Sequence, residues 1–569
     1  MPGNMSIFVN ERLTIVRECH MFYRRTIFLV LFIGFFLSQG KGQGPVVFHG
    51  KNTLQYHYAG RKGLYSSLPV SYLTNEFSGT LNVFGMPVNG ISYFSTAPEN
   101  GNLFRFSLRA TPSRYLDAFS QNTPTFVRKF LGAFETLEIG NTHPDYGILV
   151  LQHTSVRGVN IAINPGIFYA AFVTGTVTHD LHKFYRTRIN QPETRIYYGG
   201  LGIGDRRKSY LHFSFLSARD EGRGEVEEYR LRDNVVIGAS GGLSFFQNRW
   251  KTEVEGAFSV YTRDRTVPGL DEYLPIPFTF PDGLLKINAS TMGDVAFKVS
   301  SRLRLKNLSM DAQIRRTGAG YHTLGNPYLR NDLLLADGRV AWKILKKRLS
   351  VSAFFKHQYD DLAGWKDYRT SVSAAGISVA WRNAKQPWIV VNWSPWFQYA
   401  DHPTKKIKAE TSHLSLLSGY AYTINNIRAS TTVSYTRLMN SRIIDTTFFG
   451  LRSNSFSVAQ SMRLNRRLSM NGSVNLSFRD IADKNRSVYT YNIQCQYGER
   501  DGWQNRLRLS YSTFESSGEK LRIHYTTSLK VLKWLKLEGS VLRNDYFRFI
   551  SSSRLENDWI ILTSVLFTW

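Results

Sequence analysis

The 569-residue chain contains very little cysteine, and Cys19 and Cys495 are its two examples. Cys19 precedes a stretch that we interpret as an export signal, so the mature chain would keep Cys495 alone. This excludes a disulfide within the mature chain and a metal site built on cysteine. Because no other metal-ligand spacing is present, we expect neither a metal nor a cofactor.

Long apolar runs are also scarce, and the mean hydropathy is −0.26. The marked exception is residues 27–37, a run too short for a membrane-spanning helix, which needs about 20 residues. Arg24 and Arg25 precede this run, and Gly40 follows it at a suitable cleavage site. This order is typical of a secretory signal, and we expect translation to begin at Met21. A buried apolar helix is the alternative, and the charged flank and cleavage site disfavour it.

Acidic residues are few, with 43 Asp and Glu against 71 Lys and Arg, which gives a formal net charge of +28. A pI near 9.9 would also suit a nucleic-acid-binding protein. We exclude that class because the charge is spread through predicted strands without a recognition module, and because the signal exports the chain.

Catalytic motifs are missing as well. His524 and Ser528 share one strand face, and His153 and His322 fall in or near loops. Neither the glycines of a nucleophile elbow nor a metal-ligand spacing accompanies them, so we interpret them as solvated side chains. We assign no catalytic residue and predict that the protein is not an enzyme.

Alternation with a period of two is the feature that the chain does have. From residue 469 to 479, one register is apolar (Met470, Gly472, Val474, Leu476 and Phe478) and the other is polar. Similar segments of about ten residues recur toward Trp569, and aromatic residues lie near their ends. Such alternation indicates β-strands with one apolar face.

A soluble β-sandwich would alternate too, but three observations favour a membrane barrel. The segments have the length of tilted membrane-spanning strands, and the terminal aromatics suit interfacial girdles. The polar face carries Arg and Lys, which would be costly in a dry core and are tolerated in a watered lumen.

Short turns, such as Asn425-Asn426, and longer polar loops, such as residues 438–454, alternate from about residue 133 to the end, as in an up-and-down antiparallel barrel. The sequence therefore predicts an all-β transmembrane barrel of about 20–22 strands. We expect a signal peptide at 1–40, a small N-terminal α+β plug or periplasmic segment at 41–132, and the barrel at 133–569. Extra barrel hairpins within residues 79–95 remain the alternative to the plug.

These features resemble the Gram-negative outer-membrane porins and porin-like barrels. The resemblance rests on the signal, the alternation, the rhythm of the connectors and the aromatic C-terminus with Phe567 and Trp569. It implies integral insertion in the cell outer membrane, contact with its lipid and lipopolysaccharide, and recognition of Phe567 and Trp569 by the barrel-assembly machinery. The oligomeric state stays open.

The polar register predicts a basic lumen wall. Its expected pore-lining residues are Lys298, Arg302, Arg304, Arg315, Lys356, Arg428, Arg479, Arg506, Arg508, Arg522, Lys530 and Lys536. Its expected acids are Glu253, Glu255, Asp294, Asp311 and Glu538. A basic wall favours anions, so we predict a channel for small polar or anionic solutes. The alternatives are ion pairing or a position at the rims for these bases, and a non-conducting secretion component, assembly component or surface anchor for the protein.

The proline-rich connector at residues 263–290 is the longest of the loops. Long loops of this kind are often functional. We predict that it could fold inward as a constriction; a plain surface loop is the alternative. The expected constriction residues are Asp271, Glu272, Tyr273, Phe278 and Phe280.

Overall fold

The computed structural model describes sixteen segments of the chain. They are residues 46–60, 71–83, 86–96, 104–113, 125–177, 193–206, 208–221, 230–269, 284–383, 386–402, 406–445, 447–481, 484–499, 502–515, 518–547 and 558–568. The predicted signal peptide lies outside these residues and stays a prediction.

Antiparallel strands make up nearly all of the described chain. The first half of the order is β1 (Val46–Gly60), β2 (Ser71–Val83), β3 (Met86–Ser95), β4 (Phe104–Ala110), α2 (Thr125–Ala133), β5 (Phe134–Thr142), β6 (Val156–Ile163), β7 (Phe168–Val177), β8 (Glu193–Gly204), β9 (Tyr210–Glu221), β10 (Asp233–Phe245), β11 (Trp250–Thr262), β12 (Thr291–Arg304) and β13 (Leu308–Thr317). The second half is β14 (Leu333–Ile344), the 3-10 turn η5 (Leu345–Lys347), β15 (Leu349–Asp360), β16 (Arg369–Trp381), β17 (Trp388–Asp401), β18 (Lys406–Ile424), β19 (Ile427–Ile444), β20 (Thr447–Arg463), β21 (Leu468–Ile481), β22 (Lys484–Gly498), β23 (Trp503–Phe514), β24 (Gly518–Leu532), β25 (Leu535–Phe547) and β26 (Asp558–Thr568).

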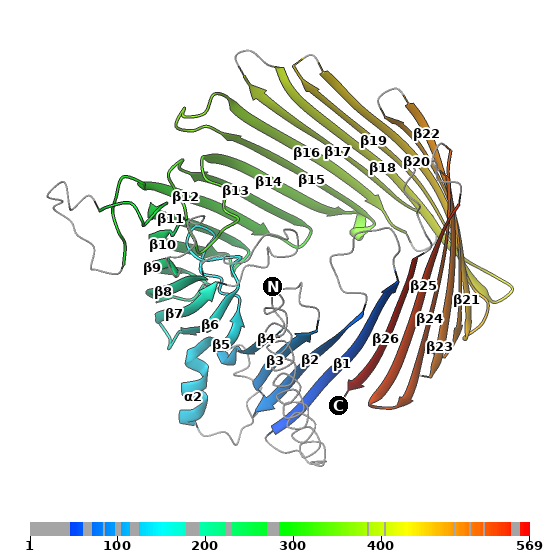
Figure 1. Ribbon diagram of the computed structural model, residues 1–569, viewed down its shortest axis with the longest axis horizontal. Coiled ribbons are helices and arrows are strands. Elements are labelled where there is room, and N and C mark those ends of the chain that lie inside the picture. The colour runs from blue at the N-terminus through cyan, green and yellow to red at the C-terminus, as the bar shows by residue number, and fades with distance from the viewer. Residues whose placement is uncertain are drawn as a thin grey trace, which may run out of the picture.

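Each strand pairs with its neighbour in sequence, and β26 returns to pair with β1, so the sheet closes into a barrel (Figure 1). The closing register runs from Lys51 opposite Thr568 to Gly60 opposite Trp559. Closure gives every strand two hydrogen-bonded neighbours and leaves no exposed sheet edge. The predicted all-β, up-and-down antiparallel barrel is therefore confirmed.

The strand number and the N-terminal segment differ from the expectation. The sheet has 26 strands rather than 20–22, because β1 to β4 belong to its wall. The expected α+β plug or periplasmic segment at 41–132 is not confirmed: β1 pairs with β2 along thirteen residues and β2 pairs with β3 along ten. The hairpin alternative for residues 79–95 describes this arrangement better.

The physical reason is that β1 to β4 are weakly patterned. Their apolar side chains are interrupted by glycine and polar residues, and the helix α2 comes next in the element order. A short interrupted run predicts a small mixed segment when it is taken alone. In the folded protein, β1 forms hydrogen bonds with β26 and β4 forms them with β5. These partners stabilise β1 to β4 as wall strands, although their own sequence pattern does not predict it.

The two faces of the wall differ in polarity. The outward register exposes large apolar side chains on strand after strand, such as Leu201, Phe213, Val254, Val474 and Tyr491. The opposite register carries the polar side chains and faces the lumen. On β21, Val474 faces outward and Asn475 faces inward, opposite Ser457 and Thr490. This alternation is the one expected for a barrel in contact with lipid.

Connectors divide the barrel into two rims. The turns predicted to be tight lie at one rim, for example between β18 and β19 at Asn425 and Asn426, both of which have positive φ. The long connectors lie at the other rim. One expected loop, at residues 438–454, is wrong: β19 and β20 continue through this range and meet beside Asp445. No helix in the described part of the chain is long and apolar enough to cross a bilayer.

Candidate functional site in the barrel lumen

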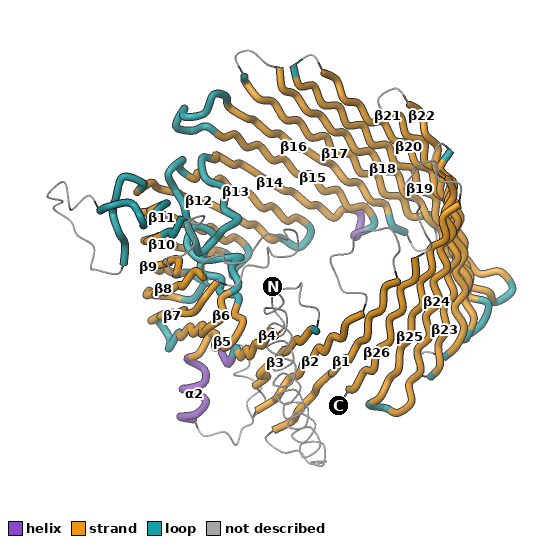
Figure 2. Tube along the Cα trace, viewed as in Figure 1, coloured by secondary structure: helices purple, strands orange, loops and turns teal. Residues whose placement is uncertain are grey.

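Two connectors from the long-loop rim fold against the inner wall. They are residues 143–155, between β5 and β6, and residues 318–332, between β13 and β14, and we call them the inner loop pair. Figure 2 draws both in teal on the interior side of the wall around β6–β12. The inward side chains of these strands are buried beneath them, which divides the lumen into a covered side and an opposite polar side.

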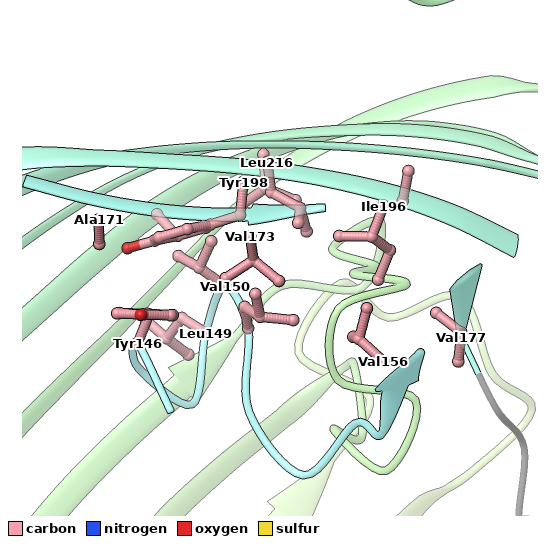
Figure 3. Close-up of a cluster of buried hydrophobic side chains, with 14 of the residues drawn as sticks. Tyr146, Leu149, Val150, Val156, Ala171, Val173, Val177, Ile196, Tyr198 and Leu216 are labelled. Atoms are coloured by element: carbon pink, nitrogen blue, oxygen red, sulfur yellow. The ribbon is translucent and has the colours of Figure 1, made fainter. Parts of the chain in front are cut away.

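The covered side has an apolar core. Leu149 and Val150 from the first loop pack with Val173, Ile196 and Leu216 from the wall, all of them buried. Figure 3 shows the loop side chains turned toward these strands. Burying a side chain of this size stabilises by about 1.5–3 kcal/mol, so the cluster is large enough to hold the loops in place.

Hydrogen bonds join the two loops to each other. The hydroxyl of Tyr321 donates to the carbonyl of Leu149 at 2.5 Å, and that of Thr323 donates to the carbonyl of Val150 at 2.8 Å. Thr154 Oγ1 donates to the carbonyl of Gly325 at 2.6 Å. Buried backbone carbonyls need such partners, so the loops satisfy each other where the wall cannot.

The wall also provides polar anchors. Asn234 on β10 is fully buried; its Nδ2 donates to the carbonyl of His322 at 3.1 Å, and its Oδ1 accepts from the amide of Leu324 at 3.0 Å. From the opposite rim, Arg206 Nη1 donates to the carbonyl of Asp145 at 2.8 Å, and its guanidinium lies 5.4 Å from the ring centre of Tyr146. The second loop is therefore anchored by Asn234 and the first loop by Arg206.

Asp332 closes the second loop. It accepts hydrogen bonds from the amides of Asp361 and Leu362 at 3.0 and 2.7 Å, and Lys366 Nζ lies 2.7 Å from its Oδ2. Burial alone would raise the pKa of Asp332, but the hydrogen bonds from Lys366 and these amides outweigh it and lower the pKa. The contribution of Asp332 to stability is therefore present above its unfolded pKa of about 3.9 and is lost as pH falls through the lower folded value.

Asp332→Asn should loosen this anchor at neutral pH without changing the shape of the side chain. Asparagine tolerates the positive φ of 50° at this position. Losing the charge-assisted bonds should cost about 1.5–3 kcal/mol locally. Amide exchange of Asp361 and Leu362 should accelerate in the variant, and in the wild type when the pH falls below about 4 after correction for the intrinsic rate. Unchanged protection in both cases would contradict this role.

The twelve basic residues expected to line the pore all stand in the inward register. Four of them form ion pairs with three acids on the same face. Lys298 lies 2.8 Å from Glu255 and Lys536 lies 2.6 Å from Glu538, while Asp311 takes both Arg302 and Arg304 at 2.9 and 3.0 Å. These four bases are therefore ion-paired, which was one of the alternatives to free pore-lining charges.

The inward bases on β19–β24 have different partners. In the described residues, no carboxylate forms an ion pair with Arg428, Arg479, Arg506, Arg508 or Arg522. Arg508 donates through Nε and Nη2 to Gln494 Oε1 at 3.1 and 2.8 Å, and Arg522 Nε donates to Asn544 Oδ1 at 3.0 Å. A neutral amide positions a guanidinium without cancelling its charge, so this side of the lumen keeps a net positive charge.

Sequence reasoning missed three further arginines on this side. Arg442 has the same inward parity on β19 as Arg428. Arg463 lies opposite Arg428 in the register, and Arg486 lies opposite Arg479. Arg463 and Arg486 lie close to strand ends, and Arg442 lies in the range 438–454 that was expected to form a loop. The pairing of β19 with β20 and of β21 with β22 is continuous, and it places these arginines in the inward register.

The expected constriction residues Asp271, Glu272, Tyr273, Phe278 and Phe280 lie outside the described residues, so their role stays a prediction. The inner loop pair was not anticipated. A signal was present, because Leu149, Val150, Leu151 and Tyr321 make these connectors more apolar than a solvated loop needs to be.

The histidines considered for catalysis do not come together. His524 Nε2 lies 3.0 Å from Ser540 Oγ, and Ser528 is four positions along β24, which places it about 13 Å away. His322 Nε2 lies 3.0 Å from Asn331 Nδ2, in the second loop of the pair. These partners describe structural hydrogen bonding.

The closed antiparallel sheet with a polar interior defines a porin-like up-and-down β-barrel. No protein-family model matches the sequence, and no curated protein matches it. Among solved structures, the translocation pore of the P pilus usher PapC is 8% identical, with 92% of this chain and 99% of that chain covered and a TM-score of 0.38.

Two other similar structures are transport proteins by their descriptions. The copper transporter OprC is 8% identical, with coverage of 92% and 80% and a TM-score of 0.41. A BenF-like porin from Pseudomonas fluorescens is 11% identical, with coverage of 63% and 96% and a TM-score of 0.29. With identities and TM-scores this low, none of these likenesses supports an argument about function.

Proposed function

We propose that this protein is an outer-membrane channel for small polar or anionic solutes. The apolar outward register supports membrane insertion, since charged side chains there would cost about 2–4 kcal/mol each near the bilayer midplane. The predicted signal at residues 1–40 supplies export, and lipid and lipopolysaccharide are the proposed neighbours. The barrel-assembly machinery is the proposed partner during insertion.

The observation that carries the proposal is the set of inward arginines on β19–β24 that lack ionic partners among the described residues. Charges in a water-filled pore with low-dielectric walls raise the local concentration of counter-ions. Arginine stays protonated throughout the physiological range, so this potential does not depend on pH. The set is Arg428, Arg442, Arg463, Arg479, Arg486, Arg506, Arg508 and Arg522.

A second candidate is a non-conducting barrel that acts as a secretion component, an assembly component or a surface anchor. The inner loop pair favours it, because stable packing inside the wall reduces the free cross-section. Conductance of the purified protein separates the two candidates.

In planar bilayers under a KCl gradient, the wild type should prefer chloride over potassium. Replacing both Arg428 and Arg479 by Glu should move the reversal potential toward cation preference, because four unit charges change at the lumen wall. Salt near 1 M should mute the shift, since the Debye length falls to about 3 Å.

Replacing Arg428 and Arg479 by Lys is the matched control, because it changes the same two side chains and keeps both positive charges. Its shift should be much smaller. A wild type that prefers cations would refute the anion channel, and an absence of conductance would support the second candidate.

A further inference from the structure

The inward faces of β19–β24 align in three adjoining rows across the six strands, which we call the polar field. The first row is Arg428, Arg463, Ser469, Gln496, Arg506 and Thr526. The second row is Ser430, Ser461, Asn471, Gln494, Arg508 and His524. The third row is Thr432, Ala459, Ser473, Asn492, Ser510 and Arg522.

The composition of the polar field is narrow. Every position is described by the structure, and none holds Asp, Glu, Phe, Tyr or Trp. Ala459 is the single apolar side chain, and the others are hydroxyls, amides, one imidazole and five guanidinium groups. Hydroxyls and amides both donate and accept hydrogen bonds, whereas guanidinium groups only donate.

The arginines are held in place by neutral groups. Arg508 uses Nε and Nη2 on Gln494, and Arg506 Nη2 donates to Gln496 Oε1 at 3.2 Å. Each guanidinium has five N–H donors, so several remain available to a ligand. Holding the side chain beforehand reduces the entropy that binding must cost.

The field is extended. Six strands at a spacing of about 4.8 Å give a width of about 24 Å. A hollow of about 350 Å³ lies at its centre, lined by side chains from β19 to β23 that include Ser430, Asn471, Asn492, Gln494 and Arg508. A field this wide exceeds what a single small ion needs for its recognition.

We propose that the polar field binds anionic oligosaccharides, and that such chains are the preferred solutes of the channel. This proposal rests on the proposed function. Sugar hydroxyls both donate and accept hydrogen bonds and so match Ser, Thr, Asn and Gln, while acidic groups along the chain match the spaced arginines. Neutral sugars usually also need aromatic faces for their apolar ring surfaces, which the field does not offer.

The test is block of the ion current by trigalacturonate, with maltotriose as the neutral counterpart and inorganic phosphate as the small anion. In planar bilayers, trigalacturonate should block at a concentration at least tenfold lower than either comparison. Arg508→Gln combined with Arg522→Gln should weaken its block at least tenfold.

Arg339→Gln is the matched control, since Arg339 is an exposed inward arginine on β14 outside the polar field. It should retain the wild-type affinity for trigalacturonate. Heat-modifiable gel mobility shows that each variant is folded, and Gln494→Ala offers a second test that leaves every charge in place and should weaken block more modestly.

The outcomes separate this proposal from the proposed function. A chloride-selective channel that maltotriose blocks as well as trigalacturonate would overturn the anionic site and leave the channel standing. Equal block by phosphate would overturn the oligosaccharide part. A cation-selective or non-conducting protein would instead contradict the proposed function itself.

Discussion

Deleting Phe567 to Trp569 should abolish most of the heat-modifiable, membrane-inserted form of the protein. Phe567 and Thr568 belong to β26, which pairs with β25 on one side and β1 on the other. The deletion removes the amide of Thr568 that donates to the carbonyl of Trp534 at 2.8 Å, and the stacking of Phe567 on Trp534. Trp569 lies outside the described residues.

The effect should be large because β26 is the closing strand. Shortening it leaves parts of β1 and β25 without a partner, and unpaired backbone is costly at membrane depth. Loss of the aromatic end would also remove the proposed label for the assembly machinery. Outer-membrane levels and gel mobility with and without heating are the measurements.

Phe547→Ala is the control for this deletion, because it removes an exposed aromatic side chain from the far end of β25. It should assemble nearly normally. Wild-type levels and mobility for the deletion would show that neither closure nor the terminal label depends on these three residues.

Val474→Arg should destabilise the barrel by about 2–4 kcal/mol, the cost of a guanidinium that faces lipid near the midplane. Val474 is 39% exposed on the outward face, near the middle of β21. Its neighbour Asn475 faces the lumen, where an added charge remains hydrated. Asn475→Arg should therefore cost well under half as much.

Urea titrations of both variants in phospholipid vesicles measure this difference directly. The two positions are adjacent, so strand, depth and substituted side chain are matched and the face is the variable. A larger loss for Asn475→Arg would mean that the inward and outward registers are exchanged, since a shift of one residue moves every side chain to the other face.

Local sequence was sufficient for the strand register where the alternation is clear. On β21, alternation from Met470 to Phe478 predicts which side chains face outward, because successive residues of a strand point to opposite faces. The same rule placed Arg428, Arg479, Arg506 and Arg508 on the inner wall. Turn residues such as Asn425 and Asn426 marked one rim, because asparagine tolerates positive φ.

Sequence alone determined a barrel of alternating strands with a basic interior, since period and polarity are local properties. Tertiary structure decided the strand membership, the ion pairs and the loop packing. The membership of β1 to β4 in the wall depends on pairing with β26, more than 450 residues away along the chain. Which arginines are neutralised depends on neighbours such as Asp311, and the inner loop pair depends on contacts between residues 143–155 and 318–332. Pairing partners, ion pairs and loop packing are set by residues distant in sequence, so no local pattern could specify them.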